Sequence, residues 1–493
     1  MVKKVVEDQW IIDKNLFNGH WQNGHAAQLI NVYNPLNNHI LASIEGVNDR
    51  DIQKSIVASH KAFQQWSRTS VDLRCQILST WAKLLKEHVS SLSRVITLES
   101  GKPLKESEAE IVYSASYLEW FANESLRAYG DVIPHDDDRR IIISKEPLGV
   151  CASITPWNFP MAMLARKVAP CLAAGSTMIV KPSELTPLSA FAFAKLGLEA
   201  GLPNDVISVI VGDAAHIGHA FAHSDIVRKL SFTGSTRVGQ LLYENSASTV
   251  KKLSLELGGN APMIILEDAD IDHAVSEAIN SKFRFSGQTC VCVNRLYVHR
   301  KVYTQFQKKL VSKMKKLVLG DGLDPKTTMG PLINKYAIDK VERLVEEAKS
   351  RGAHVVLGGQ RHYSDQHFYE PTILGQVPET ADILHEEIFG PVVTLIPFDD
   401  ENAVIEAANN TPYGLAAYLF GQHADTLWRI SRSLEFGMVG INSGLISNVK
   451  CPFGGVKYSG FGREGSKYGL DEYMAIKYIN WQLGPNHHQE KKS

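Results

Sequence analysis

Residues 228–246 have the sequence RKLSFTGSTRVGQLLYENS, in which an apolar strand pattern passes through a glycine turn into a helix pattern. The turn places Gly234 and Gly239 where backbone N–H groups at the start of a helix can approach a pyrophosphate. The spacing is not GxGxxG, so a tight turn between a strand and a helix, without any ligand, explains it equally well. Both interpretations stay open on these residues alone.

Short strand patterns alternate with helix patterns around this stretch. The strand patterns cover residues 176–184 and 205–212, and the helix patterns cover 187–201 and 216–224. Such alternation predicts a parallel sheet with helices on both faces, which is a doubly wound α/β domain. A similar alternation begins after Gly258 and continues to about residue 440, so we expect a second α/β domain.

The segment before residue 158 has a different spacing of its apolar residues. Apolar residues at helical spacing predict helices within residues 50–100 and 106–128. β-Branched runs broken by Pro147 and Gly149 then predict a strand, a turn and a second strand over residues 139–157.

Composition favours a small-molecule partner. The 493 residues are enough for two or three domains, and a hydrophobic content of 44% with 21% charged residues is ordinary for a globular protein. Lys plus Arg number 52 and Asp plus Glu number 53, which leaves a net charge of −1. No net field therefore attracts nucleic acid or an anionic membrane.

The N-terminus and the cysteine count favour a cytoplasmic location. Charged residues interrupt the opening sequence MVKKVVEDQWIIDKN before a long apolar run develops, so we expect neither a signal peptide nor a spanning helix. Six cysteines in 493 residues are too sparse for a disulfide scaffold and suit a reducing compartment. Free thiols are then available for chemistry.

Two clusters imitate metal sites. Three histidines share one helical face, but no carboxylate or cysteine joins them at ligand spacing, so a solvated or capping face is expected for His216, His219 and His223. Three acids imitate the start of a calcium loop, namely Asp268, Asp270 and Asp272. His273 replaces the required glycine and Ile279 the bidentate glutamate, so these acids are expected at a helix N-terminus instead. We expect no metal.

Cys290 and Cys292 stand one residue apart in FSGQTCVCVNR, residues 285–295. A zinc site needs about four ligands, and no second cysteine pair is present. A permanent disulfide between positions i and i+2 would be strained, and a reducing compartment opposes it. A nucleophile, or two inert buried thiols, remain as interpretations of these residues.

Six motifs decide between these interpretations: TPWNFP at 155–160, KPSELTP at 181–187, ELGGNAP at 256–262, GQTCVCVNR at 287–295, EEIFGPV at 386–392 and PFGGVKYSGFGREGS at 452–466. Together and in this order, they resemble the aldehyde dehydrogenase superfamily along essentially the whole chain. The resemblance implies a Rossmann-type cofactor domain, a second α/β catalytic domain and a small β oligomerisation element.

The resemblance also implies domain boundaries and an assembly. The dinucleotide-binding domain would comprise residues 1–123 and 145–257, and the catalytic domain residues 258–466. Residues 124–144 and 467–485 would form oligomerisation strands, followed by a disordered tail at 486–493. The alternating pattern in AIKYINWQ suits an edge strand that pairs with another subunit, so a homodimer or homotetramer is expected.

The same resemblance makes Cys290 the nucleophile. Its thiolate would attack an aldehyde to form a thiohemiacetal, a hydride would pass to a nicotinamide, and water would hydrolyse the resulting thioester. Asn158 would donate to the oxyanion together with the backbone N–H of Cys290. Glu256 would activate the water, and Gly258 and Gly259 would let the backbone bend there. Since CoA-acylating relatives typically lack this base, hydrolysis to a free acid is expected.

Cofactor residues follow from the same motifs. Glu184 is informative, because a carboxylate accepts a hydrogen bond from a ribose 2′-hydroxyl but repels a 2′-phosphate, so NAD is expected. The nearby charge of Arg237 leaves NADP open. The implied cofactor-binding residues are Thr155, Pro156, Trp157, Lys181, Ser183, Glu184, Gly234, Ser235, Glu387 and Phe389.

Two arginines indicate the substrate class. Arg166 and Arg284 would point into the tunnel that ends at Cys290, and two guanidiniums in one pocket suggest a substrate carboxylate. With Ser447, they look like the carboxylate-binding set of succinate-semialdehyde dehydrogenases, which act in the degradation of γ-aminobutyrate. The expected reaction is NAD(P)-dependent oxidation of succinate semialdehyde to succinate. Alternatives are another carboxylated aldehyde, such as glutarate semialdehyde, or a catalytically silent binding protein.

Some members of that subfamily form a reversible disulfide between the nucleophile and a second cysteine. By resemblance, Cys292 is a redox partner for Cys290, and oxidation would block the enzyme reversibly. A small packed thiol at position 292 is the alternative.

Overall fold

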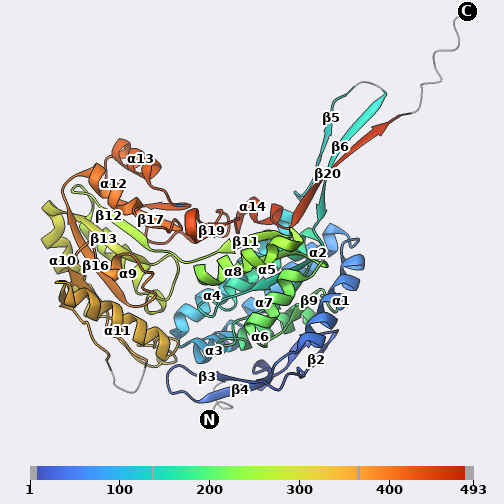
Figure 1. Cartoon of the computed structure of the whole chain (residues 1–493), viewed down its shortest axis with the longest axis horizontal. Coiled ribbons are helices and arrows are strands. Elements are labelled where there is room, and N and C mark those ends of the chain that lie inside the picture. Colours follow the sequence, from blue (N-terminus) through green and yellow to red (C-terminus); the bar gives the residue numbers. More distant parts are fainter. Residues whose placement is uncertain (1–7, 136–137, 363–366, 484–493) are drawn as a thin grey trace, which may run out of the picture.

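The stretch 228–246 forms strand β10 (Val227–Thr233) followed after two residues by helix α8 (Thr236–Ser246) in the computed structural model of the chain. Ser235 is the N-cap of α8, and its side chain accepts a hydrogen bond from the backbone N–H of Val238. The structure describes residues 8–135, 138–362 and 367–483, and the tail expected at 486–493 lies outside them. Two α/β lobes lie side by side, and a narrow strand arm projects from one of them (Figure 1).

The first lobe contains an eight-stranded sheet in the order β19-β11-β10-β7-β8-β9-β1-β2. The five central strands β11, β10, β7, β8 and β9 are parallel to one another. The outer strands β19, β1 and β2 pair antiparallel with their neighbours. Besides β10, its strands are Asn15–Phe17 (β1), His20–Gln22 (β2), Val150–Ile154 (β7), Thr177–Lys181 (β8), Ile207–Val209 (β9), Lys252–Glu256 (β11) and Gly460–Phe461 (β19).

Helices cover both faces of this sheet. On one face α1, α7 and α8 share an apolar core that includes Ile52, Phe221 and Leu242. On the other face α2 to α6 pack around Trp81, Phe121 and Phe191. Besides α8, these helices are Asp49–Trp66 (α1), Val71–Glu87 (α2), Val89–Ser100 (α3), Leu104–Ser125 (α4), Ala162–Ala174 (α5), Leu188–Glu199 (α6) and Ala214–His223 (α7). The expected doubly wound α/β architecture is confirmed, since this layering is what it requires.

The second lobe is built on a seven-stranded sheet in the order β14-β15-β16-β13-β12-β17-β18, antiparallel only between β14 and β15. Its strands are Ala261–Ile265 (β12), Val293–His299 (β13), His354–Leu357 (β14), Thr372–Gly375 (β15), Val392–Phe398 (β16), Ala416–Phe420 (β17) and Met438–Ile441 (β18). Its helices are Ile271–Lys282 (α9), Arg300–Met314 (α10), Lys335–Ser350 (α11), Glu401–Asn409 (α12) and Ala424–Ser433 (α13).

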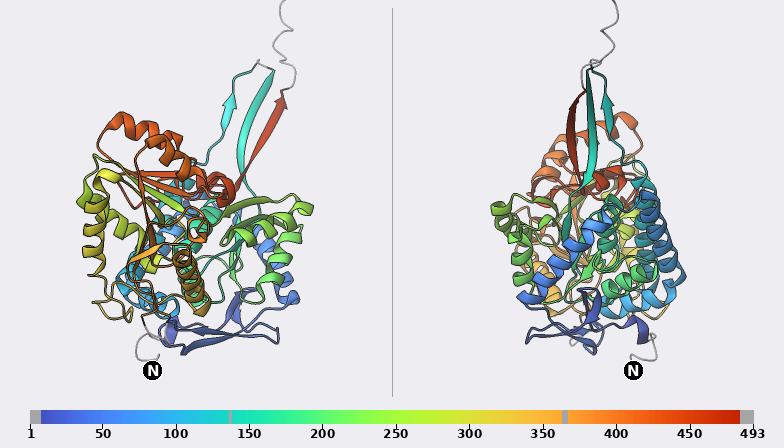
Figure 2. Two further views of the ribbon diagram at one scale, coloured as in Figure 1. Left: turned by 60° about the vertical axis from the view of Figure 1, so that its left-hand side comes forward. Right: turned by 90° about the vertical axis from the view of Figure 1, so that its right-hand side faces the viewer.

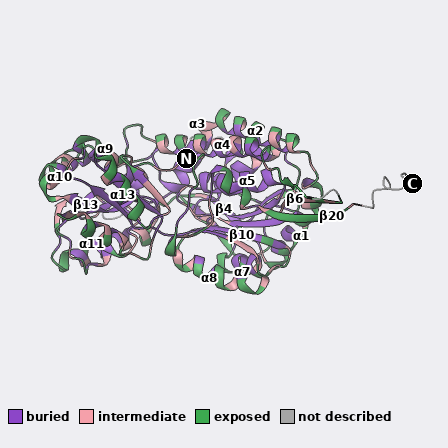
Figure 3. Ribbon diagram, turned by 90° about the horizontal axis from the view of Figure 1, so that it is seen from above, coloured by how far each residue is buried: buried purple, intermediate pink, exposed green. Residues whose placement is uncertain are grey.

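The arm is a separate three-stranded sheet in the order β20-β6-β5, formed by Asp131–Ile133 (β5), Arg139–Pro147 (β6) and Met474–Gln482 (β20). It extends away from the lobes in every view, and helix α14 (Ser466–Asp471) lies at its base (Figure 2). Apolar side chains along it are exposed, including Val132, Ile476, Tyr478 and Trp481. The ribbon of β20 is accordingly coloured as exposed in Figure 3. At the opposite end of the first lobe, a two-stranded sheet is formed by Leu29–Tyr33 (β3) and Ile40–Glu45 (β4).

The two clusters that resemble metal sites in the sequence occupy ordinary structural positions. Asp270 is the N-cap of α9 and accepts hydrogen bonds from the backbone N–H groups of Asp272 and His273, as expected for acids at a helix N-terminus. His216, His219 and His223 are exposed on α7. Among the described residues, no group of three or more His, Cys, Asp or Glu is arranged to hold a metal ion. No helix in the described segments has the length and apolar character needed to cross a bilayer.

Candidate active site

The strand order of the first sheet reverses beside β7. Strands β8 and β9 continue on one side of it, whereas β10 and β11 lie on the other. In open parallel sheets, ligands bind at the carboxyl ends of strands at such a reversal. The segments that follow β7 and β10 contain Trp157 and Asn158 in one case, and Gly234 and Ser235 in the other. The topology therefore brings two of the sequence motifs to one crevice.

Residues of both lobes line a cavity of about 730 Å³ at this crevice. The predicted site residues in its lining are Pro156, Trp157, Asn158, Arg166, Gly234, Ser235, Glu256, Arg284, Cys290, Glu387, Phe389 and Ser447. Thr155, Lys181, Ser183 and Glu184 lie outside the lining, at or just beyond the ends of β7 and β8. Cys292 is also outside it and is only 2% exposed.

Cys290 lies in a loop between α9 and β13 that begins with the short helical turn η4 (Arg284–Gly287). Phe285 and Ser286 adopt φ values of 47° and 54°, a left-handed conformation that non-glycine residues adopt only at a cost. Two hydrogen bonds hold this turn: the Phe285 N–H donates to Glu106 Oε2 at 2.8 Å, and Ser286 Oγ donates to the carbonyl of Gly330 at 2.7 Å. The path of the loop that presents Cys290 is therefore fixed from outside the loop.

The Cys290 thiol is protonated at neutral pH in this state. Burial raises its pKa to about 12, and the Glu387 carboxylate acts in the same direction. The Arg166 guanidinium opposes both effects. Since the thiolate is the nucleophile, reaction at neutral pH requires that the proton leave the sulfur.

Asn158 directs its amide toward the Cys290 loop. Its Nδ2 donates to the carbonyl of Gln288 at 3.0 Å, and its Oδ1 accepts from the Phe159 N–H at 3.1 Å. The amide orientation is therefore determined, and the second Nδ2 hydrogen remains available to a ligand. This hydrogen can hold an oxyanion formed beside Cys290.

Glu256, the last residue of β11, is 3% exposed, and neither of its carboxyl oxygens has a hydrogen-bond partner among the described residues. Burial raises its pKa well above the usual range, and the neighbouring Glu464 adds to this effect. Arg166 and Lys167 act against it. A buried carboxyl with free oxygens and a raised pKa has the properties of a general base.

Residues around the ends of β7 and β10 fit a dinucleotide. Thr155 Oγ1 and Thr233 Oγ1 are buried without a hydrogen-bond partner in the described part of the chain, which points to a polar ligand there. Lys181 Nζ lies 2.9 Å from Glu184 Oε2, and the Glu184 side chain remains half exposed. The N-terminus of α8 at Ser235 offers backbone N–H groups to an anion. These groups suit the phosphates and the ribose of NAD or NADP.

Glu387 and Phe389 belong to the second lobe and also line the cavity. Glu387 Oε1 accepts from the backbone N–H of Gly259 at 2.9 Å, which leaves Oε2 available to a ligand. The Phe389 ring meets the Trp157 ring edge to face, with centroids 5.5 Å apart, and Phe389 has a positive φ of 55°. An aromatic pair and a carboxylate therefore line the same cavity, a combination that suits a nicotinamide and its ribose.

Comparison with known proteins identifies the family of the chain. Residues 21–479 match the model of the aldehyde dehydrogenase family. The chain belongs to that family. It is 48% identical to a succinate-semialdehyde dehydrogenase [NADP(+)] of Escherichia coli (strain K12), over 95% of this chain and 98% of that protein. It is also 48% identical to a glutarate-semialdehyde dehydrogenase of Pseudomonas putida, over 94% and 96% of the two chains.

A solved structure gives the same result for the fold. The crystal structure of an E. coli NADP dependent enzyme superimposes with a TM-score of 0.96 at 48% identity, covering 97% of this chain and 100% of the other. The expected aldehyde dehydrogenase fold and enzyme class are confirmed.

In this aldehyde dehydrogenase, Arg166 is fully buried and only partly satisfied. Its Nε lies 2.8 Å from Glu464 Oε2, and the guanidinium stacks 3.8 Å from the Phe453 ring centroid. Its Nη2 has no hydrogen-bond partner among the described residues, and the same holds for Arg284 Nε. Glu464 also pairs with Lys167 at 2.6 Å, so two cations share one carboxylate. The cavity wall therefore keeps a positive charge that an anion can neutralise.

Several residues around the site were not predicted from sequence. Helix α4 and the bend before it contribute Lys102, Glu106 and Glu110, and the segment before α14 contributes Glu464. Glu106 and Glu110 stand four residues apart, which indicates a shared helix face, but that pattern is typical of any solvated helix. Only the fold reveals that this face of α4 is turned toward the active site.

We predict that iodoacetamide alkylates Cys290 of the free enzyme at a rate that rises about tenfold per pH unit between pH 6 and 9, because only the thiolate reacts. A thiol pKa of about 12 gives no plateau in this range. Mass spectrometry of the Cys290 peptide at timed intervals gives the rate. A plateau near neutral pH would show that the thiol is already ionised in the resting enzyme.

Proposed function

We propose that this aldehyde dehydrogenase oxidises succinate semialdehyde to succinate with NAD(P) as the oxidant. The supporting observation is the pair of incompletely bonded guanidiniums, Arg166 and Arg284, in the cavity that also contains Cys290. A carboxylate at the far end of a short aldehyde would complete their hydrogen bonds. The comparison with relatives named for this aldehyde supports the same substrate.

The reaction uses this chain's groups in order. The Cys290 sulfur bonds to the aldehyde carbon, and the oxygen, now an oxyanion, is held by Asn158 Nδ2, a contact worth about 3 kcal/mol in the transition state. When bound, the nicotinamide supplies the acceptor for the hydride that leaves this carbon. Glu256 takes a proton from water, whose oxygen displaces the sulfur from the thioester. One aldehyde, one water and one oxidised cofactor give one carboxylate, one reduced cofactor and two protons.

Glutarate semialdehyde is the second candidate, since a relative of equal identity is named for it. Both aldehydes carry the carboxylate that the arginines would bind, and they differ by one methylene. A single methylene changes binding by only about 1–3 kcal/mol, so both are expected to react, at different rates.

NAD is the proposed preferred cofactor, with NADP as an alternative. Lys181 pairs with Glu184, and this pair lowers the pKa of the Glu184 carboxyl against the effect of burial, so the group is ionised. An ionised carboxylate favours a ribose 2′-hydroxyl over a 2′-phosphate. The exposed Arg237 and the relative named for NADP support the alternative.

We also propose a cytoplasmic homodimer or homotetramer. All six cysteines, each in a described segment, are free thiols, as suits a reducing compartment. The apolar residues exposed on β20 and β5 suit an arm that pairs with another subunit.

The substrate proposal predicts selective losses. Arg166→Ala and Arg284→Ala should each lower kcat/KM for succinate and glutarate semialdehydes by roughly 10- to 200-fold, because a charge-assisted hydrogen bond is lost. With propanal, which has no carboxylate, the loss should be below about threefold for Arg284→Ala. For Arg166→Ala it should be smaller than with the charged aldehydes but larger than about threefold, because Arg166 also lowers the pKa of Cys290 and Glu256. Initial rates with each aldehyde and with NAD or NADP measure this, and equal losses with propanal would contradict the proposal.

We also propose that Cys292 is a reversible redox partner of Cys290, which predicts reversible inactivation by oxidants. Cys292 Sγ donates to the carbonyl of Gly287 at 3.2 Å, so it must turn away from this bond before it can reach Cys290. Peroxide should inactivate the enzyme, and dithiothreitol should restore it, because a disulfide protects the nucleophile from further oxidation. A Cys292→Ala variant should lose activity without recovery. Recovery equal to that of the parent enzyme would exclude Cys292 as the partner.

The assembly proposal predicts a particle of two or four chains. Light scattering after size-exclusion chromatography should give two or four times the chain mass of 54.6 kDa at micromolar concentration. Ile476→Lys combined with Tyr478→Lys should shift the particle to a smaller size, since charges on an exposed strand oppose pairing. A monomer in the parent protein would contradict the proposal.

A further inference from the structure

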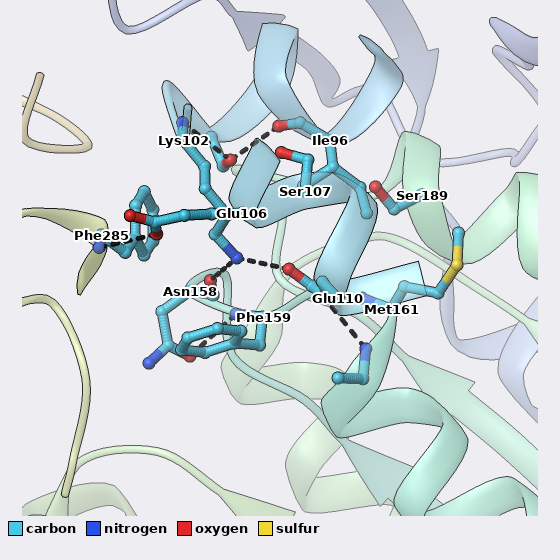
Figure 4. Close-up of polar contacts among 12 residues, drawn as sticks. Ile96, Lys102, Glu106, Ser107, Glu110, Asn158, Phe159, Met161, Ser189 and Phe285 are labelled. Carbon is cyan, nitrogen blue, oxygen red and sulfur yellow. Dashed lines mark hydrogen bonds and ion pairs between the residues drawn. The ribbon is translucent and has the colours of Figure 1, made fainter. Parts of the chain in front are cut away.

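Lys102 is a buried lysine in the bend between α3 and α4, and its side chain is 0% exposed. Figure 4 shows it between the start of α4 and the segment that contains Asn158. Its Nζ lies 3.8 Å from the centroid of the Phe159 ring and 4.6 Å from that of Phe285. Burial removes the hydration of an ammonium group at a large cost in free energy. Charged or polar partners inside the protein must therefore bind it closely.

Those partners are on the active-site wall. Lys102 Nζ donates to the backbone carbonyl of Asn158 at 2.8 Å and to the Glu110 carboxylate. The carbonyl belongs to the same residue whose side chain points toward the Cys290 loop. The ammonium group therefore anchors the backbone of Asn158, while Gln288 and Phe159 orient its amide.

Glu110 anchors the next few residues. Its Oε1 accepts from the backbone N–H groups of Met161 at 3.0 Å and Ala162 at 3.2 Å, at the start of α5 (Figure 4). A carboxylate is stabilised at this position by the unpaired N–H groups and the dipole of the helix. With Lys102 on Asn158, the pair holds both ends of the segment 158–162.

One turn earlier on α4, Glu106 holds the other side of the site. Its Oε2 accepts from the Phe285 N–H at the strained turn that begins the Cys290 loop. Lys102 and Glu106 thus contact the two segments that carry the proposed oxyanion hole, namely the segment that contains Asn158 and the turn that begins the Cys290 loop. Transition-state stabilisation by such donors depends on their fixed geometry, and a displacement of 1 Å can cost about 100-fold in rate.

We propose that the Lys102–Glu110 pair positions the oxyanion hole, so that its loss lowers the rate of the chemical step while leaving substrate binding and the Cys290 loop intact. This inference rests on the proposed function, in which Asn158 Nδ2 holds the oxyanion. Lys102 acts through Asn158 and is a positioning residue. A purely structural pair would change stability alone.

The test compares Lys102→Met, Glu110→Gln and their double variant with Asn158→Ala and Lys229→Met. Lys229 is the matched control, because it is also a fully buried lysine paired with a glutamate, Glu472, at 3.1 Å. Four readouts are needed: kcat and KM for the aldehyde, cofactor-free hydrolysis of p-nitrophenyl acetate, alkylation of Cys290 by iodoacetamide, and Tm. Ester hydrolysis needs the oxyanion hole, whereas alkylation needs only the thiolate.

Lys102→Met should lower kcat and ester hydrolysis together by roughly 10- to 100-fold, with KM and the alkylation rate within about threefold of the parent enzyme. Lys229→Met should lower Tm but keep kcat within about threefold. If Lys102→Met does not fold, the double variant, which leaves no unpaired buried charge, should fold and show the same loss. Near-parental kcat in a folded Lys102 variant, or alkylation that falls with kcat, would overturn the inference.

Failure of the proposed function has a different signature. If the parent enzyme oxidises no carboxylated aldehyde, the substrate assignment is wrong, yet the ester and alkylation readouts still test Lys102. If Asn158→Ala retains ester hydrolysis, the role of Asn158 itself is wrong. Loss in Asn158→Ala with none in Lys102→Met would reject the positioning role alone.

Discussion

The close contact between the Gly259 backbone and the carbonyl of Cys290 joins the two lobes at the backbone of the proposed nucleophile. A Cβ atom at position 259 would lie 2.4 Å from that carbonyl oxygen, which no side chain can tolerate. Gly259 lies three residues after Glu256, and its N–H also binds Glu387. One glycine therefore fixes how the proposed base, the nucleophile and the cofactor side of the cavity lie relative to one another. The rest of the site depends on this contact because each group belongs to a different element.

Buried charge is the second constraint on the site. Arg166, Lys167 and Glu464 are almost fully buried, and the two cations lower the pKa of Glu464 against the effect of burial, so it stays ionised. Glu256 lies nearby, has no hydrogen-bond partner in the part of the chain that the structure describes, and has a raised pKa. The same cluster thus contains one carboxylate that is ion-paired with two cations and one that is free to exchange a proton. Different surroundings give two identical carboxyl groups different pKa values, so the two groups can have different protonation states at one pH.

Much of this arrangement could be predicted from the sequence, because it depends on short local patterns. The alternation around residues 228–246 predicts β10 and α8, and the resemblance of the motifs to the aldehyde dehydrogenase family points to Cys290 and Glu256. The contacts that hold these residues could not be predicted. Lys102 and Asn158 are 56 residues apart, and the left-handed Phe285 has no glycine to signal it. Strand β19 joins the first sheet beside β11 from a segment expected in the other domain, because only the folded chain brings residue 460 against Glu256.

The charge balance also links substrate binding to the base. Arg166 is one of the groups that lower the pKa of Glu256. A substrate carboxylate held by Arg166 would offset that effect, so Glu256 would become a stronger base with a smaller ionised fraction. Glu256 can then assist the attack of water on the thioester only after it has lost its own proton. A site that binds an anionic substrate therefore also has to remove a proton from Glu256 in each cycle. The cations beside Glu464 lower the pKa of Glu256, which limits how difficult that removal becomes.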